Sequence, residues 1–363
     1  MSNCGLQNQD ISKFVDGLTS DPGTWSGQPL ISVTQLTVPG LDLLIRTAAE
    51  MRKLVMTKGG DDRLKHRILA SIFYEASTRT SCSFQTAMMR LGGTVMHVDA
   101  GSGGNTSSKK GESINDTVKC LQCYTDVTVM RHHVKGTVTD TVLNGRLTKP
   151  LINAGDGVGE HPTQALLDLF TVVDELGMLE ESKRRCGNDK PLVIVMLGDL
   201  KHGRTVHSLA KLLGRAQLGF LKRPLILRYC SPDTLRMPAY VKEYISDYAT
   251  RRGCNIVQEE CSSINEAMQN ADVLYTTRVQ KERFDNAQDY NSVKGAYVID
   301  AELMKSAPEK MIVMHPLPRV DEIDADIDTD PRAAYFRQME NGLYVRMAIL
   351  ALVLGKGDSR CRL

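Results

Sequence analysis

The sequence has no apolar run long enough to cross a membrane and no strong excess of charge of either sign. Its longest apolar stretch, residues 347–355, is far shorter than the roughly 20 residues that a membrane-spanning helix needs. Forty-five Lys and Arg residues against forty-three Asp and Glu residues leave a net charge of +2. Proteins that bind nucleic acid or a membrane surface usually have a stronger basic bias. We therefore expect neither of these partners, and any local cluster of cations becomes informative.

Zinc motifs and a disulfide framework are also lacking. The nine cysteines are an odd number, and Cys120-x-x-Cys123 has neither a second such pair nor a histidine pair to complete a metal site. We interpret this pair as two small core thiols of a buried helix. So many free thiols favour a reducing cytoplasm, with residence in an organelle as the alternative. The N-terminus lacks the features of a secretory signal, and residues 10–18 have the pattern of a short capped amphipathic helix.

The length and composition predict two globular domains. The chain has 363 residues, of which 42% are hydrophobic and 24% charged. Apolar strand patterns alternate with helical patterns, which is typical of doubly wound α/β domains, each with a mostly parallel sheet flanked by helices. We expect strands at 67–74, 94–98, 127–130, 150–153, 192–197, 225–229, 273–276, 297–299 and 311–314, and helices at 38–55, 81–91, 113–124, 161–176, 205–213 and 335–354. The predicted division is an extension at 1–29, a first domain at 30–160 completed by the helix 335–363, and a second domain at 161–334.

Ligands of such sheets bind beyond the carboxyl ends of the strands, so the segments there form the candidate site. Glu75 to Ser81 is a hydroxyl-rich turn that opens a helix, where free N–H groups and the helix dipole suit a phosphate and Arg79 can add a bidentate partner. An ordinary Ser/Thr cap with an exposed arginine would have the same sequence. This turn is no nucleotide P-loop, and residues 198–204 lack the GxGxxG spacing of a dinucleotide site.

Cations gather at these predicted strand ends or in adjoining loops, namely Arg79, Lys110, Arg131, Arg204 and Arg278. Such a cluster predicts one or two small substrates with several negative charges. The site also offers a histidine and a glutamine from the segment between the domains, but no Cys or Ser beside a base, no paired carboxylates and no metal-ligand spacing. We therefore expect anion positioning and oxyanion stabilisation, without a cofactor or a metal.

Several motifs, in this order, resemble the transcarbamoylase superfamily and within it the aspartate branch: STRT, KKGES, VMRH, HPTQALLDLFT, GDLKHGRTVHSL, TRVQKER and MHPLPRVDEI. The resemblance runs from about residue 30 to residue 355. The ornithine branch has an HCLP turn where this chain has His315 to Pro318, which favours aspartate as the acceptor. The resemblance implies transfer of a carbamoyl group from carbamoyl phosphate to L-aspartate, in the second step of pyrimidine biosynthesis. A transcarbamoylase for another amino acid and a non-catalytic anion-binding paralogue are the alternatives.

The resemblance also implies roles for individual residues in a cleft between the domains. The implied ligands of carbamoyl phosphate are Ser77, Thr78, Arg79, Thr80, Arg131, His161, Gln164 and the carbonyls of Pro316 and Leu317. Of these, Arg79, Thr80, Arg131 and His161 are implied to be catalytic, and the departing phosphate is the implied proton acceptor. The implied aspartate ligands are Lys110, Arg204, Arg278, Gln280 and Leu317.

A shared active site is a further implication. Lys110 and Ser107, with Ser108 as the alternative serine, are expected to come from a neighbouring subunit of a homotrimer. Glu75 is expected to pair with Arg204 and Arg283 when the domains close. The resemblance leaves open whether the chain works within a larger pyrimidine-pathway assembly.

Overall fold

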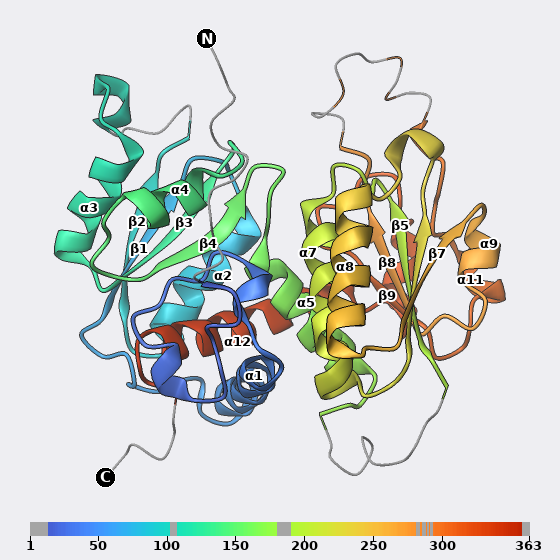
Figure 1. Ribbon diagram of the computed structural model, residues 1–363, viewed down its shortest axis with the longest axis horizontal. Helices are drawn as coiled ribbons and strands as arrows, with labels where there is room; N and C mark the ends of the chain where they lie inside the picture. Colours follow the sequence, from blue (N-terminus) through green and yellow to red (C-terminus); the bar gives the residue numbers. More distant parts are fainter. Residues whose placement is uncertain are drawn as a thin grey trace. The chain divides into compact units, whose positions relative to one another are not determined.

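A computed structural model describes residues 14–101, 107–179, 190–280, 284, 288, 290 and 293–357 (Figure 1). The chain divides into two compact units, which we call unit 1 (residues 1–166 and 341–363) and unit 2 (residues 167–340). The divisions fall within the helices α5 (Pro162–Glu175) and α12 (Tyr335–Val353). The boundaries expected from the sequence lie at the starts of these helices.

Unit 1 contains a four-stranded parallel sheet in the order β2-β1-β3-β4. Its strands are β1 (Ile68–Phe73), β2 (Thr94–Asp99), β3 (Val127–His132) and β4 (Leu151–Asp156), and its helices are α1 (Val38–Lys58), α2 (Thr78–Arg90), α3 (Ile114–Tyr124) and α4 (Thr137–Asn144). Apolar side chains of α3 and α4, such as Val118 and Val138, pack on Ala70, Ile72 and Met130 of the sheet. The strands β3 and β4 are buried along their whole length, so their ends are rigid supports for a site.

Unit 2 contains a five-stranded parallel sheet in the order β7-β6-β5-β8-β9. Helices α7 and α8 lie on one side of this sheet and α9 and α11 on the other (Figure 1). The strands are β5 (Leu192–Gly198), β6 (Leu225–Cys230), β7 (Ile256–Cys261), β8 (Val273–Thr277) and β9 (Ile312–Met314). The helices are α7 (Arg204–Ala216), α8 (Ala239–Arg252), α9 (Ile264–Ala267) and α11 (Ala301–Ser306).

The fold agrees with the two doubly wound domains expected from the sequence. Short helical turns connect the longer elements. The turns are η2 (Pro22–Thr24), η3 (Val33–Gln35), η4 (Ser107–Lys110), η5 (Gln217–Leu221), η6 (Asp233–Leu235) and η8 (Ala325–Thr329). Among the residues described here, no helix is both long enough and apolar enough to span a membrane.

Three local expectations are wrong. Residues 14–18 do not form the α-helix expected at 10–18, because Asp16 has a left-handed φ of +55° and the Leu18 N–H bonds to the Gln35 carbonyl at 2.9 Å. Residues 10–13 lie outside the described residues. The strand expected at 297–299 is a single bridge between Ile299 and Ile323. Cys120 and Cys123 are exposed on α3 rather than in the core.

Candidate functional site

Adjacent strand ends in unit 1 bring together most of the residues expected to bind carbamoyl phosphate. Phe73 at the end of β1 is in register with Arg131 of β3, and His132 of β3 is in register with Asp156 at the end of β4. The segments that follow β1 and β4 therefore leave the sheet at the same edge. We call the group Ser77, Thr78, Arg79, Thr80, Arg131, His161 and Gln164 the first half-site.

The turn after β1 leads into the N-terminus of α2. Ser77 precedes the helix in an extended conformation (φ −157°, ψ 93°), but its side chain makes no capping hydrogen bond. The first turn of α2 contains no acidic residue that could compete for its N–H groups. Thr78 and Arg79 are exposed, whereas Thr80 is buried. This arrangement differs from a side-chain-capped helix start and suits an incoming anion.

Arg131 is 9% exposed and lies within β3, which extends past the expected end of this strand. Its Nε–H group donates to Oε2 of Glu75 at 3.2 Å. Gly155 of β4 makes room for this side chain, because a Cβ atom at that position would lie 3.3 Å from the Arg131 Nη1 atom. Glu75 thus pairs within unit 1. Its expected pairing with Arg204 stays a prediction, and Arg283 lies outside the described residues.

The neighbouring His132 contributes no positive charge near neutral pH. Burial and the adjacent His133 lower the pKa of the His132 imidazole to about 4. Its Nδ1 atom accepts a hydrogen bond from the Val134 N–H group at 3.0 Å. Arg131 therefore remains the cation at this end of β3.

His161 and Gln164 are held at the start of α5. They are 3% and 6% exposed, so both residues are buried. The His161 carbonyl accepts the N–H groups of Gln164 at 3.1 Å and Ala165 at 3.2 Å. Glu160 ties this segment to the N-terminal region, because its Oε2 atom accepts the Val33 N–H group at 3.1 Å.

Ser107 and Lys110 form the two ends of the short turn η4. Both residues are exposed in the single chain. Their expected contribution to the site of a neighbouring subunit stays a prediction, as does the choice between Ser107 and Ser108.

In unit 2, three adjacent strand ends form a second group, Arg204, Arg278, Gln280, Pro316 and Leu317, which we call the second half-site. Gly198 at the end of β5 is in register with Thr277 of β8, and Tyr275 of β8 is in register with Met314 of β9. A Cβ atom at Gly198, whose φ is +106°, would lie 2.2 Å from the Thr277 carbonyl oxygen. Glycine is needed here for β5 and β8 to approach each other.

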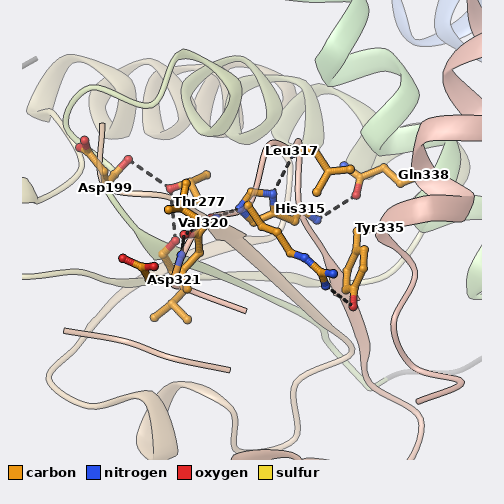
Figure 2. Close-up of polar contacts among 11 residues, drawn as sticks. Asp199, Thr277, His315, Leu317, Val320, Asp321, Tyr335 and Gln338 are labelled. Atoms are coloured by element: carbon orange, nitrogen blue, oxygen red, sulfur yellow. Dashed lines mark hydrogen bonds and ion pairs between the residues drawn. The ribbon is translucent and has the colours of Figure 1, made fainter. Parts of the chain in front are cut away.

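Asp199 connects the segments that carry Arg204 and Gln280, and the sequence analysis did not select it. This fully buried residue accepts the His202 N–H group at 3.0 Å and lies 3.1 Å from the His202 Nδ1 atom. Its Oδ2 atom also accepts the Gln280 N–H group at 3.4 Å. Figure 2 shows Asp199 beside Thr277, whose hydroxyl group donates to the Asp199 carbonyl at 3.4 Å. The sequence contains a signal for Asp199, because this carboxylate directly follows a buried strand that ends in a glycine.

The turn after β9 contains a residue whose backbone is not extended. Leu317 has a left-handed φ of +51°, and the Leu317–Pro318 peptide bond is cis. The Leu317 N–H group donates to the His315 Nδ1 atom at 2.8 Å (Figure 2). The His315 Nε2 atom lies 2.7 Å from Oε1 of Glu322. Burial acts to raise the pKa of the Glu322 carboxyl, but the hydrogen bond from His315 and nearby backbone N–H groups outweigh it and lower this pKa.

A cavity of about 210 Å³ in unit 2 borders this second half-site. Its lining includes Gly198, Arg278, Val279, Tyr297 and Glu322. Within the described residues, no group of three or more His, Cys, Asp or Glu side chains is placed to hold a metal ion. The two half-sites together offer arginines, N–H groups and hydroxyl groups, which are suited to phosphate and carboxylate ligands.

Comparison with models of protein families matches two regions of the chain. Residues 28–174 match the carbamoyl-phosphate-binding domain of aspartate/ornithine carbamoyltransferases, and residues 190–353 match their aspartate/ornithine-binding domain. The chain belongs to the aspartate/ornithine carbamoyltransferase family. This carbamoyltransferase fold carries the first half-site in the first matched region and the second half-site in the other.

Of three individual relatives, two are aspartate enzymes by name and one is a multifunctional protein. The aspartate carbamoyltransferase catalytic subunit of Aliivibrio fischeri (strain MJ11) is 42% identical over 90% of this chain and 96% of that subunit. Multifunctional protein pyr1-3 of Dictyostelium discoideum is 48% identical over 92% of this chain, which spans only 14% of that protein's length. A crystal structure of Trypanosoma cruzi aspartate transcarbamoylase in complex with carbamoyl phosphate and aspartate is 40% identical, with a TM-score of 0.81, and covers 91% of this chain and 98% of that chain.

Proposed function

We propose that this carbamoyltransferase moves the carbamoyl group of carbamoyl phosphate to the α-amino group of L-aspartate. The products are N-carbamoyl-L-aspartate and phosphate, which is the second step of pyrimidine biosynthesis. The observation that carries the proposal is the 42% identity with an aspartate carbamoyltransferase catalytic subunit over 90% of this chain. The half-sites support it, because one suits a phosphate and the other offers arginines for carboxylates.

Carbamoyl phosphate is assigned mainly to the first half-site. The N–H groups of α2, the hydroxyl groups of Ser77 and Thr78, and Arg79 bind the phosphate, where exposed and uncapped groups favour an anion. Thr80, Arg131 and His161 are all buried and donate to the carbonyl oxygen. Gln164 and the carbonyls of Pro316 and Leu317 accept hydrogen bonds from the carbamoyl nitrogen.

Aspartate is assigned to the second half-site together with Lys110. Arg204 and Arg278 bind the two carboxylates, because a guanidinium group forms paired hydrogen bonds with a carboxylate. Gln280 adds a contact from a segment that Asp199 holds at the end of β8. Leu317 contributes to this pocket as well as to the carbamoyl pocket.

The reaction follows from these positions. The α-amino nitrogen of aspartate attacks the carbonyl carbon, and a tetrahedral oxyanion forms. Thr80, Arg131 and His161 stabilise this charge, and removal of one such donor typically lowers the rate by ~10²–10³-fold. The bond between the carbonyl carbon and the phosphate oxygen then breaks, and the departing phosphate takes the proton of the amine.

A direct activity assay tests this function. We expect the purified chain to carbamoylate L-aspartate and to prefer it to L-ornithine, with phosphate released in equal amount. Preference for ornithine would overturn the choice of acceptor. Binding of carbamoyl phosphate without transfer to any amino acid would support the non-catalytic alternative instead.

Assembly and location complete the proposal. We infer a homotrimer in which Ser107 and Lys110 of one subunit reach the site of the next, which agrees with the exposure of both residues in the single chain. The multifunctional relatives support a role for related chains in larger assemblies. The cytoplasmic location expected from the free thiols stays a prediction.

A further inference from the structure

The turn between His315 and Pro318 holds one residue in a conformation that its side chain disfavours. Leu317 has a φ of +51°, which brings the Cβ atom of an L-residue close to its own backbone. A leucine keeps such a conformation only when its surroundings fix it. One contact that holds its amide is the hydrogen bond from the Leu317 N–H group to the His315 Nδ1 atom, at 2.8 Å.

The orientation of the His315 ring is set by a second contact. His315 is 1% exposed, and its Nε2 atom lies 2.7 Å from Oε1 of Glu322. Because an ionised carboxylate can only accept, Nε2 carries the ring proton and Nδ1 is left as the acceptor that the Leu317 amide requires. Glu322 is itself fixed, since its Oε2 atom accepts the N–H groups of Val320 and Asp321 at 3.2 Å each.

The backbone of His315 is anchored from the opposite direction. Its N–H group donates to Oε1 of Gln338 at 2.9 Å, and Figure 2 shows His315 in contact with both Leu317 and Gln338. The Gln338 Nε2 atom donates to Oδ1 of the fully buried Asp168 at 2.6 Å. Contacts from α12, itself tied to α5, therefore hold the backbone of His315, and contacts within the segment after β9 hold its ring.

We propose that His315 and Glu322 are positioning residues that keep the carbonyls of Pro316 and Leu317 aimed at the carbamoyl nitrogen. This inference rests on the proposed function, which makes these carbonyls ligands of the carbamoyl group. Neither side chain touches the substrate in this assignment. Glu322 sets the proton on the ring of His315, and His315 holds the Leu317 N–H group. This hydrogen bond fixes the Pro316 carbonyl, which lies in the same peptide plane, and thereby positions the start of the next peptide unit, which carries the Leu317 carbonyl.

Two substitutions of His315 separate the contacts of its two nitrogens. His315→Asn places an amide oxygen near the position of Nδ1 and keeps an acceptor for the Leu317 N–H group. His315→Gln reaches toward Glu322 instead and leaves that N–H group without its acceptor. We expect His315→Gln to raise the KM for carbamoyl phosphate and to lower kcat/KM by roughly tenfold or more. His315→Asn should stay within a few-fold of the wild type.

Binding of inorganic phosphate provides the control. The proposed phosphate ligands lie in unit 1, so its Kd, measured by titration calorimetry, should be unchanged in both variants. Glu322→Gln should lower kcat/KM in the wild-type background and have little further effect in the His315→Gln background, because the two residues act through one contact. This third variant also tests the proposal should one His315 variant fail to fold.

The outcomes distinguish this proposal from the function itself. A wild-type chain without carbamoyl transfer overturns the proposed function and this inference with it. An active wild type whose His315→Gln variant has normal constants overturns the inference alone. Equal loss in His315→Asn and His315→Gln, or a parallel loss of phosphate binding, would show a general structural role and would also overturn it.

Discussion

Arg131 lies in a buried strand and depends on a glycine in the neighbouring strand. Gly155 has a φ of +130°, and a Cβ atom there would meet the guanidinium group at 3.3 Å. We expect Gly155→Ala to displace Arg131 and to lower kcat, with an effect approaching the ~10²–10³-fold that follows removal of an oxyanion donor. Steady-state kinetics, with the melting temperature measured in parallel, check this prediction.

Gly136 provides the matched control for that substitution. It also has a positive φ, +87°, but a Cβ atom there would meet nothing within 4 Å. Gly136→Ala should therefore share the backbone strain and leave kcat close to that of the wild type. A similar fall in kcat for both variants would argue against a specific effect on Arg131.

His132 makes stability depend on pH. Its pKa is lowered to about 4 in the folded chain, against about 6.5 in an unfolded one. The contribution of neutral His132 to the free energy of unfolding is therefore complete above pH ~6.5. It is lost as the pH falls toward about 4, because the unfolded chain takes up a proton that the folded chain does not. His132→Asn keeps an acceptor for Val134 but does not titrate. Denaturant unfolding at several pH values should show that the free energy of unfolding falls less with decreasing pH in this variant than in the wild type. The same pH dependence in both proteins would contradict the lowered pKa of His132.

At the scale of elements, Asp199 joins the start of α7 to the end of β8. Asp199→Asn removes the charge that holds His202 and the Gln280 amide, and hydrogen bonds to charged groups are worth about 1.5–3 kcal/mol. We expect the KM for aspartate to rise roughly tenfold or more while the Kd for inorganic phosphate stays unchanged. The exposed Asp233→Asn is the control, and a phosphate defect in Asp199→Asn would point to general misfolding.

The elements also show what the sequence could predict. Buried strands such as β5 have continuous apolar runs and were predicted within one or two residues. The edge strand β7 has a partly exposed, charged pattern, and α8 is largely polar, so neither was expected. The site residues are expected from family resemblance and stay predictions, whereas the left-handed conformation of Leu317 was not expected. Its conformation depends on His315, Glu322 and Gln338, which are separated in the sequence and meet only in the folded chain.

At the scale of the whole molecule, the proposed trimer makes each site depend on two chains. Lys110→Ala and Arg204→Ala chains should each be nearly inactive alone, since one lacks the residue given to a neighbour and the other lacks a residue of its own site. When both are unfolded, mixed and reassembled, some sites receive an intact Lys110 and an intact Arg204. Activity should therefore return in the mixture but not in either variant treated alone. Sedimentation analysis of differently tagged chains must show mixed trimers, and mixed trimers without recovered activity would contradict the shared site.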